Sequence, residues 1–162
     1  GYLTDTVKAC TCSAAEVQRY RSRLSGPLLD RIDIQCEITP VPFKDISKAA
    51  PGEPSANIRE RVIKAREIQA ARYKDYKGIH CNAQMTERMI HQFAEPNEAG
   101  IDMLRMAMEK LSLSARAYSR ILKVARTIAD LEGCEHVELH HLAEAIGYRA
   151  LDRGDWAERG HI

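Results

Sequence analysis

Arg31 is the first residue whose position suggests chemistry on a phosphate. It lies in the segment LSGPLLDRIDI (residues 24–34), after a Gly-Pro turn and between Asp30 and Asp33. A guanidinium presents a planar fork of N–H donors that matches the oxygens of a phosphate. The spacing leaves two interpretations open. Arg31 either reaches a phosphate or ties down its two acidic neighbours.

Arg116 is the second candidate, because it falls in the first turn of a helix predicted to begin after Ser114. The positive end of the helix dipole disfavours a cation at that position. A nearby anion would explain the arginine, and the alternative is an exposed side chain that points away. Arg120 and Arg126 of the same helix are expected at the surface or at a subunit interface.

Cys10 and Cys12 are two thiols separated by a single residue, a spacing at which both can bind the same zinc ion. A structural zinc site needs four ligands. No second close pair of cysteines follows, and no histidine lies in the first 79 positions. The sequence therefore predicts at most half of a zinc site, and no bound metal is expected for this chain alone.

The adjacent residues His140 and His141, together with Glu138 and Glu144, have the composition of a metal cluster. His141 and Glu144 are three residues apart and would share a helix face. Packing and helix capping explain the same residues without a metal, and we expect these structural roles.

A helix predicted to start at Ser55 is rich in cations. A basic helix face can follow a phosphate backbone, whereas a solvated charged face has no ligand. The residues that DNA or a neighbouring subunit would contact are Arg59, Lys64, Arg66 and Arg72.

The elements that position these residues are predicted to be mainly helices. Ser13 and Glu16 form a capping-box pattern that starts a helix over 14–24. Thr86, Asn97 and Ser114 are predicted to cap later helices, and residues 55–76 and 139–151 are predicted as two more. Alternating apolar residues at 32, 34 and 36 predict a strand over 32–38.

The composition indicates a folded protein with no membrane span. The chain has 162 residues, 44% hydrophobic and 29% charged, with a formal net charge of +1. Its five cysteines are unevenly spread, which argues against a secreted disulfide framework and for the cytoplasm. A chain that opens at Gly1 without a methionine is expected to be either an excised piece of a longer protein or one that begins with the remainder of a processed tag.

The segment around Arg31 and the segment LSARAYSRILKVARTIADL (residues 113–131) resemble motifs of the magnesium-chelatase-like AAA+ ATPases, in particular the ComM/YifB family. The resemblance covers roughly residues 1–153. It implies that Arg31 is an arginine finger for the nucleotide site of a neighbouring subunit. It also implies that Arg116 is the sensor 2 arginine, and that a Cys-Pro-Cys pair upstream completes a cysteine knuckle with Cys10 and Cys12.

The resemblance implies a mainly α architecture, an all-helical AAA+ lid preceded by the last helix and strand of a truncated α/β ATPase core. The resemblance divides the chain into four parts, which are residues 1–42 for the end of the core, 43–54 for a linker, 55–153 for the helical lid with sensor 2, and 154–162 for a tail.

By the same resemblance, the function is that of a ring-forming, hexameric DNA branch-migration helicase active in natural transformation and recombination. Its partners would be identical subunits and DNA. ATP and Mg²⁺ would bind to the full-length protein, because no phosphate-binding loop (Gly-x-x-x-x-Gly-Lys-Ser/Thr) occurs here and this chain alone should not hydrolyse ATP. One alternative is the ATPase subunit of a metal-insertion complex of the magnesium-chelatase type. Another is a stand-alone helical interaction module, in which Arg31 would be buried in a local salt bridge.

Overall fold

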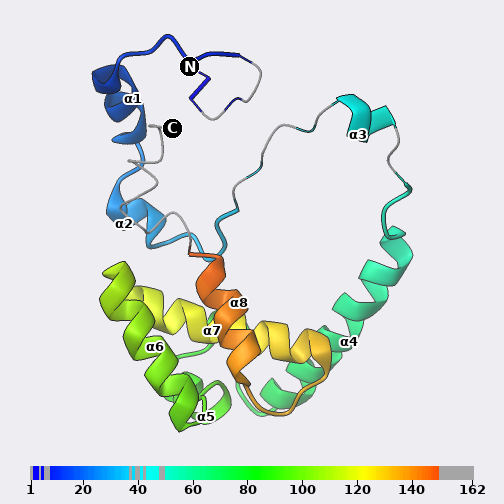
Figure 1. The fold of residues 1–162 in the computed structure, drawn as a ribbon. Helices are drawn as coiled ribbons and strands as arrows, with labels where there is room; N and C mark the ends of the chain where they lie inside the picture. The colour runs from blue at the N-terminus through cyan, green and yellow to red at the C-terminus, as the bar shows by residue number, and fades with distance from the viewer. Residues whose placement is uncertain are drawn as a thin grey trace.

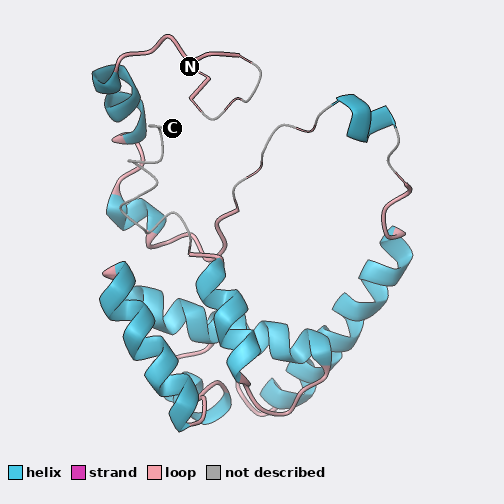
Figure 2. Ribbon diagram, in the orientation of Figure 1, coloured by secondary structure: helices cyan, strands magenta, loops and turns pink. Residues whose placement is uncertain are grey.

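The computed structural model describes residues 2–3, 5, 8–36, 38, 41, 43–47 and 50–149. Within these residues the regular elements are helices and no strand is present (Figure 2), which confirms the predicted mainly α class. None of the described helices is both long enough and apolar enough to cross a membrane. The elements in chain order are α1 (Ala14–Arg21), α2 (Gly26–Leu29), α3 (Phe43–Ser47), α4 (Ser55–Tyr73), η1 (Asn82–Gln84), α5 (Glu87–Phe93), α6 (Glu98–Leu111), α7 (Ala115–Glu132) and α8 (Leu139–Gly147).

Side-chain caps start four of these helices where the sequence predicts. Ser13 and Glu16 form the reciprocal capping box of α1. The side-chain oxygens of Thr86, Asn97 and Ser114 accept backbone N–H groups three residues on, at 3.4, 3.0 and 3.2 Å. Each cap satisfies a donor that the first helical turn leaves without an intrahelical partner.

Helix α7 is the centre of the helical part, where it contacts α4, η1, α5 and α8, while α6 packs on α8 (Figure 1). Its apolar stripe follows the helical period, and Ala117, Ile121 and Ala125 are fully buried as predicted. The core around α7 is made mainly of aliphatic and methionine side chains, with Tyr73 as its buried aromatic residue.

Helix α4 is packed only along its second half. Ile58 and Val62 are 43% and 42% exposed, whereas Ala65 and Tyr73 are buried. Figure 1 shows the first turns of α4 extending away from the helices that pack around α7. The short helix α3 lies inside the segment predicted to be an irregular linker.

The predicted strand over 32–38 is wrong for the described residues of that range. Ile32 and Ile34 are 40% and 52% exposed, and no strand forms. The backbone N–H of Gln35 donates instead to the carbonyl of Tyr148, at 2.8 Å. Alternation creates two faces, but a strand also needs a paired neighbour for its backbone, and the described residues supply none. The prolines predicted to end the strand and the predicted tail at 154–162 lie outside the described residues.

Candidate functional site

Arg31 lies on the surface just after α2, the four-residue helix that Leu29 anchors to the rest of the chain. Leu29 is 8% exposed, so the turn is pinned on its apolar side. The Nη1 atom of Arg31 donates to the carbonyl of Pro27 at 2.6 Å. This bond orients the guanidinium against its own turn and leaves the side chain accessible from outside.

The two acidic neighbours of Arg31 are engaged elsewhere, so the interpretation in which they hold Arg31 is wrong. Asp30 lies 3.6 Å from Nη2 of Arg149, which follows α8. Asp33 pairs with Arg120 of α7, which is 30% exposed in its side chain. Sequence reasoning did not single out Arg149, because no local spacing connects it to a segment more than a hundred residues earlier.

A cleft of about 760 Å³ lies between the segment after Arg31 and α7. Arg116, Arg120 and Lys123 line it from α7 at helical spacings that place them on one face. Arg120 is occupied by Asp33, and Lys123 donates to the carbonyl of Ala83 at 3.0 Å.

Arg116 differs from the other two cations of the cleft. It occupies the first turn of α7, as the sequence predicts, and its side chain is exposed. It makes no ion pair or hydrogen bond with any residue that the structure describes. A cation held at the positive end of a helix dipole without a partner is suited to an added anion.

Two tyrosines line the same cleft and remain protonated at neutral pH. Burial, then the charges of Glu95 and Glu87, raises the pKa of Tyr118. The hydrogen bond to Glu144 raises the pKa of Tyr148, whose hydroxyl donates to that carboxylate at 2.8 Å. Both phenols therefore contribute neutral walls to the cleft.

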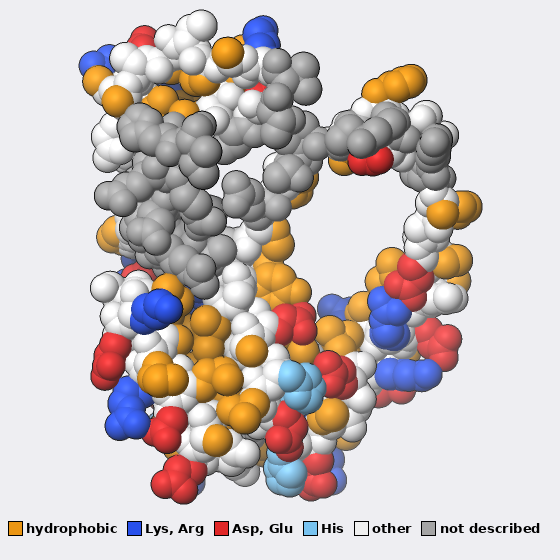
Figure 3. Space-filling view, viewed as in Figure 1, with side chains coloured by type: hydrophobic (Ala, Val, Ile, Leu, Met, Phe, Trp, Pro, Cys, Tyr) orange, Lys and Arg blue, Asp and Glu red, His pale blue; other side chains and the backbone are white. Residues whose placement is uncertain are grey.

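The cationic residues of α4 fall into two groups. Arg59, Lys64 and Arg66 are exposed, and Lys64 pairs with Glu60 at 2.8 Å, which raises the pKa of Lys64. In the face shown in Figure 3, basic and acidic side chains are interspersed along α4. Arg72 differs, because its side chain is only 13% exposed and points toward Asp130 of α7. Its place in the core removes it from a DNA-contacting surface.

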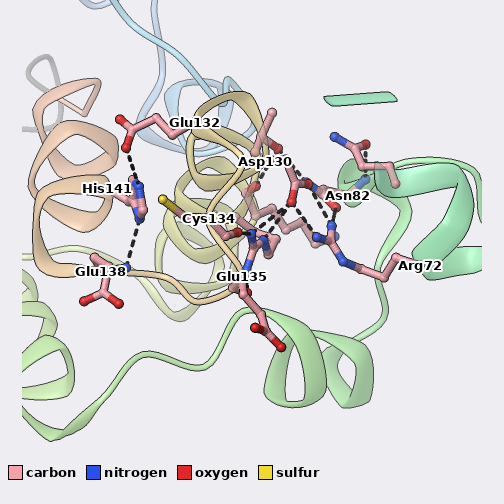
Figure 4. Close-up of polar contacts among 12 residues, drawn as sticks. Arg72, Asn82, Asp130, Glu132, Cys134, Glu135, Glu138 and His141 are labelled. Atoms are coloured by element: carbon pink, nitrogen blue, oxygen red, sulfur yellow. Dashed lines mark hydrogen bonds and ion pairs between the residues drawn. The ribbon is translucent and has the colours of Figure 1, made fainter. Parts of the chain in front are cut away.

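Arg72 belongs to a buried polar network that joins α4, η1 and α7 (Figure 4). Its Nη1 atom donates to Oδ2 of Asp130 at 2.7 Å, and its Nη2 atom bonds the other carboxylate oxygen. Asn82 donates to the same Oδ2 at 2.8 Å and accepts the hydroxyl proton of Tyr73 at 2.7 Å. The carboxylate of Asp130 is therefore fully used inside the protein.

Arg126 completes this network, and its expected place at the surface is wrong. Its side chain is 2% exposed, and its Nε atom donates to Asp130 at 3.1 Å. Its Nη1 and Nη2 atoms donate to the carbonyls of Glu135 and Cys134 at 2.7 and 2.5 Å. Burial lowers the pKa of Arg126. Burial acts in the same direction on Arg72, but there the hydrogen bond and charge of Asp130 raise the pKa overall.

The histidine pair forms a cluster with Glu132 rather than with Glu144. Nε2 of His140 and Nε2 of His141 lie 2.9 and 3.0 Å from Oε2 of Glu132 (Figure 4 shows the His141 contact). The backbone N–H of Glu138 donates to Nδ1 of His141 at 2.9 Å. Nδ1 is then an acceptor, so the neutral ring carries its proton on Nε2 and donates it to Glu132. A metal on Nε2 would displace that proton. The geometry therefore fits helix capping, as predicted for His141, better than metal binding.

We predict that Glu132 stabilises the chain in a pH-dependent way. Hydrogen bonds from His140 and His141 lower the pKa of Glu132 from its ordinary value of 4.5. A carboxylate with a lowered folded-state pKa contributes its full stabilisation above 4.5 and loses it as the pH falls through the folded-state value. Glu132→Gln should therefore lower the melting temperature at pH 6, and the difference from the unsubstituted chain should narrow below pH 4.5. Exposed Glu109→Gln is the control, and a difference for Glu132→Gln that stays constant down to pH 3 would contradict this prediction.

Cys10 and Cys12 are half-buried, with free thiols. Hydrogen bonds from the backbone of Cys12 and Tyr2 lower the pKa of Cys10, which favours the thiolate that metals bind. Within the described part of the chain, no third side chain joins them in a metal-ligating group. The zinc knuckle remains a prediction.

Comparisons with known proteins place both arginines in matched regions. Residues 1–46 match the family "Magnesium chelatase, subunit ChlI", and residues 52–149 match "Magnesium chelatase, subunit ChlI C-terminal". Competence protein ComM of Haemophilus influenzae is 44% identical over 142 residues, which are 87% of this chain and 27% of ComM. The uncharacterized protein YifB of Escherichia coli is 41% identical over 143 residues, 88% of this chain and 27% of YifB. An uncharacterized protein of Mycobacterium tuberculosis is 36% identical over 140 residues, 86% of this chain. The chain thus spans about a quarter of the length of these relatives.

Proposed function

This chain belongs to the magnesium-chelatase-like ComM/YifB family, and from that premise we propose that it is the part of an AAA+ ATPase that supplies an arginine finger, Arg31, and a sensor 2 arginine, Arg116. The other parts of the full-length protein would bind ATP and Mg²⁺. Arg31 would act on nucleotide held by a neighbouring copy. This division requires a ring of identical subunits, which we propose to be a hexamer.

The observation that carries the proposal is the state of Arg116. It is an exposed cation without a partner among the described residues, in the first turn of an 18-residue helix, at the rim of a cleft that Arg120 and Lys123 also line. A guanidinium there attracts an anion more strongly than a neutral side chain does. The phosphates of ATP would supply that anion.

The exposure of Arg31 supports a role in a neighbouring subunit. A stand-alone interaction module predicts Arg31 buried in a local salt bridge. Arg31 instead bonds the carbonyl of Pro27 and remains exposed, while Asp30 and Asp33 pair with other arginines. The helical part does contain its own core, as a module would, but that core does not include Arg31.

We propose DNA as the client, moved by a branch-migration helicase that acts in natural transformation and recombination. ComM is named a competence protein, which motivates this assignment. The exposed cations Arg59, Lys64 and Arg66 of α4 are the candidates for DNA contact. The matched family description favours a second candidate, an ATPase subunit of a magnesium-chelatase complex. Stimulation of ATP hydrolysis by branched DNA would distinguish the helicase from the chelatase subunit.

The role of Arg116 is tested by Arg116→Ala in the full-length protein. A charge-assisted hydrogen bond contributes about 1.5–3 kcal/mol, so we expect the Kd for ATP to rise roughly 10- to 100-fold. Titration with a fluorescent ATP analogue measures the Kd, and steady-state turnover is recorded on the same samples. Arg88→Ala is the matched control, because Arg88 is exposed and occupies the same position in the first turn of α5. An unchanged Kd and unchanged turnover for Arg116→Ala would remove Arg116 from the nucleotide site.

A further inference from the structure

The residues that flank Arg31 are attached to the end of α8. Arg149, whose side chain is 1% exposed, faces Asp30 at 3.6 Å between Nη2 and the carboxylate. Its Nη1 atom donates to the carbonyl of Ile32, 117 residues earlier. The N–H of Gln35 donates to the carbonyl of Tyr148 at 2.8 Å. Residues 30–35, here called the finger turn, are thus bound at both ends to the residues that follow α8.

The finger turn is also attached to α7, next to Arg116. Asp33 pairs with Arg120, across 87 residues of sequence. Arg120 lies one helical turn after Arg116, so the two side chains share a face of the same rigid helix. Arg31 therefore lies between residues that are bound to α7 and to the segment after α8, while its own guanidinium stays exposed.

We propose that Arg120 and Arg149 are positioning residues for Arg31, which hold the finger turn on α7 and α8 so that the presentation of Arg31 follows the position of the lid. The inference rests on the proposed function, because it matters only if Arg31 serves a neighbour's nucleotide. Arg120 and Arg149 touch no substrate in this scheme. They act through the backbone of the finger turn.

This arrangement links two nucleotide sites. In this scheme, nucleotide that binds to Arg116 displaces α7. Arg120 lies one turn later on the same helix and moves with it. Arg120 moves Asp33, and with it the turn that delivers Arg31 to the next subunit. Displacement of a catalytic group by about 1 Å can lower the rate by a factor of roughly 100. Weaker attachment of the finger turn should therefore lower kcat.

The test is a double-mutant cycle on the exposed pair of the full-length protein. Asp33→Asn and Arg120→Gln should each lower kcat for ATP hydrolysis roughly 10-fold with KM unchanged. The double variant should be no slower than the slower single variant, since both changes remove the same interaction. Exchange of the charges, Asp33→Arg with Arg120→Asp, should restore at least half of the lost activity.

A check of the fold, a control pair and a third test variant accompany the cycle. Asp33 and Arg120 are 52% and 30% exposed, so their substitution should leave the fold intact, which circular dichroism checks. Asp102→Asn with Arg105→Gln removes another exposed Asp–Arg pair, on α6, and should leave kcat unchanged. Arg149→Lys keeps the charge of the buried residue but loses its planar fork, and should lower kcat in the same way.

The kcat of Arg31→Ala, compared with that of the Asp33 and Arg120 variants, distinguishes a failure of the positioning role from a failure of the arginine finger. If Arg31→Ala lowers kcat while Asp33→Asn and Arg120→Gln do not, the positioning role is overturned and the finger stands. Strictly additive losses in the cycle would likewise overturn it, because they would show two independent surface effects. If Arg31→Ala itself leaves kcat unchanged, the proposed finger fails and the positioning role fails with it.

Discussion

Arg31→Ala in the full-length protein is expected to lower kcat for ATP hydrolysis about 10³-fold while the Kd for ATP stays within a factor of about 3. Arginine fingers are worth roughly 10³ to 10⁵ in rate, because they neutralise charge that develops on the γ-phosphate only in the transition state. The exposed guanidinium of Arg31 is free to make that contact outside its own turn. Steady-state phosphate release and nucleotide titration measure the two quantities.

Arg23→Ala is the control for Arg31→Ala, because Arg23 is also exposed and lies shortly before α2. It should change kcat by less than a factor of about 2. If Arg31→Ala behaves like Arg23→Ala, the arginine-finger assignment is wrong.

Mixing of variants tests whether Arg31 acts on a neighbour. Subunits with Arg31→Ala keep an intact nucleotide site, and subunits with Arg116→Ala keep an intact finger. In a mixed ring, some Arg116→Ala subunits stand beside the intact site of an Arg31→Ala subunit and supply its finger. Turnover above that of either variant alone is therefore expected, and its absence would indicate that Arg31 acts within its own subunit.

Asp130→Ala is expected to destabilise the 162-residue chain by about 3–5 kcal/mol, the cost of leaving buried charges without their partner. Asp130 is fully buried and receives hydrogen bonds from Arg72, Arg126 and Asn82. Its removal leaves the guanidinium groups of Arg72 and Arg126 without the carboxylate that pairs with them. Urea unfolding followed by circular dichroism at 222 nm measures the change in the free energy of unfolding.

Two further variants show whether the charge of Asp130 matters and whether its burial does. Asp130→Asn keeps the size of the side chain but removes the charge, so it should retain only part of the lost stability. Asp102→Ala breaks an exposed pair with Arg105 and should cost about 0–1 kcal/mol. A loss below about 1 kcal/mol for Asp130→Ala would mean that water replaces the carboxylate and that the network is not a structural centre.

The network has a consequence for the site, because it joins α4 and η1 to the helix that carries Arg116. Arg72 reaches Asp130 across 58 residues of sequence, and Asn82 also donates to Thr127 of α7 at 3.0 Å. A charged network that is fully hydrogen-bonded resists displacement of its members. Arg72 is therefore a structural residue of the lid rather than a ligand of DNA.

The sequence by itself determined where four helices begin and which arginines are candidates. Ser13, Thr86, Asn97 and Ser114 cap helices as predicted, because a capping side chain bonds a backbone group only three residues away. The apolar period of α7 likewise decides which of its faces is buried. Both properties are local, so a single sequence contains them.

Only the tertiary structure decided which partner each charge has and whether the apolar alternation at 32–36 makes a strand. Arg120 lies 87 residues from its partner Asp33, Arg72 lies 58 residues from Asp130, and Arg149 lies 117 residues from the carbonyl of Ile32. The position of Arg126 along α7 predicts a surface residue. It is buried instead, and its guanidinium donates to carbonyls of the loop that follows α7. Pairing over such separations depends on how the helices pack, and no spacing along the chain encodes it. For the same reason a strand cannot be assigned without the neighbour that would satisfy its backbone.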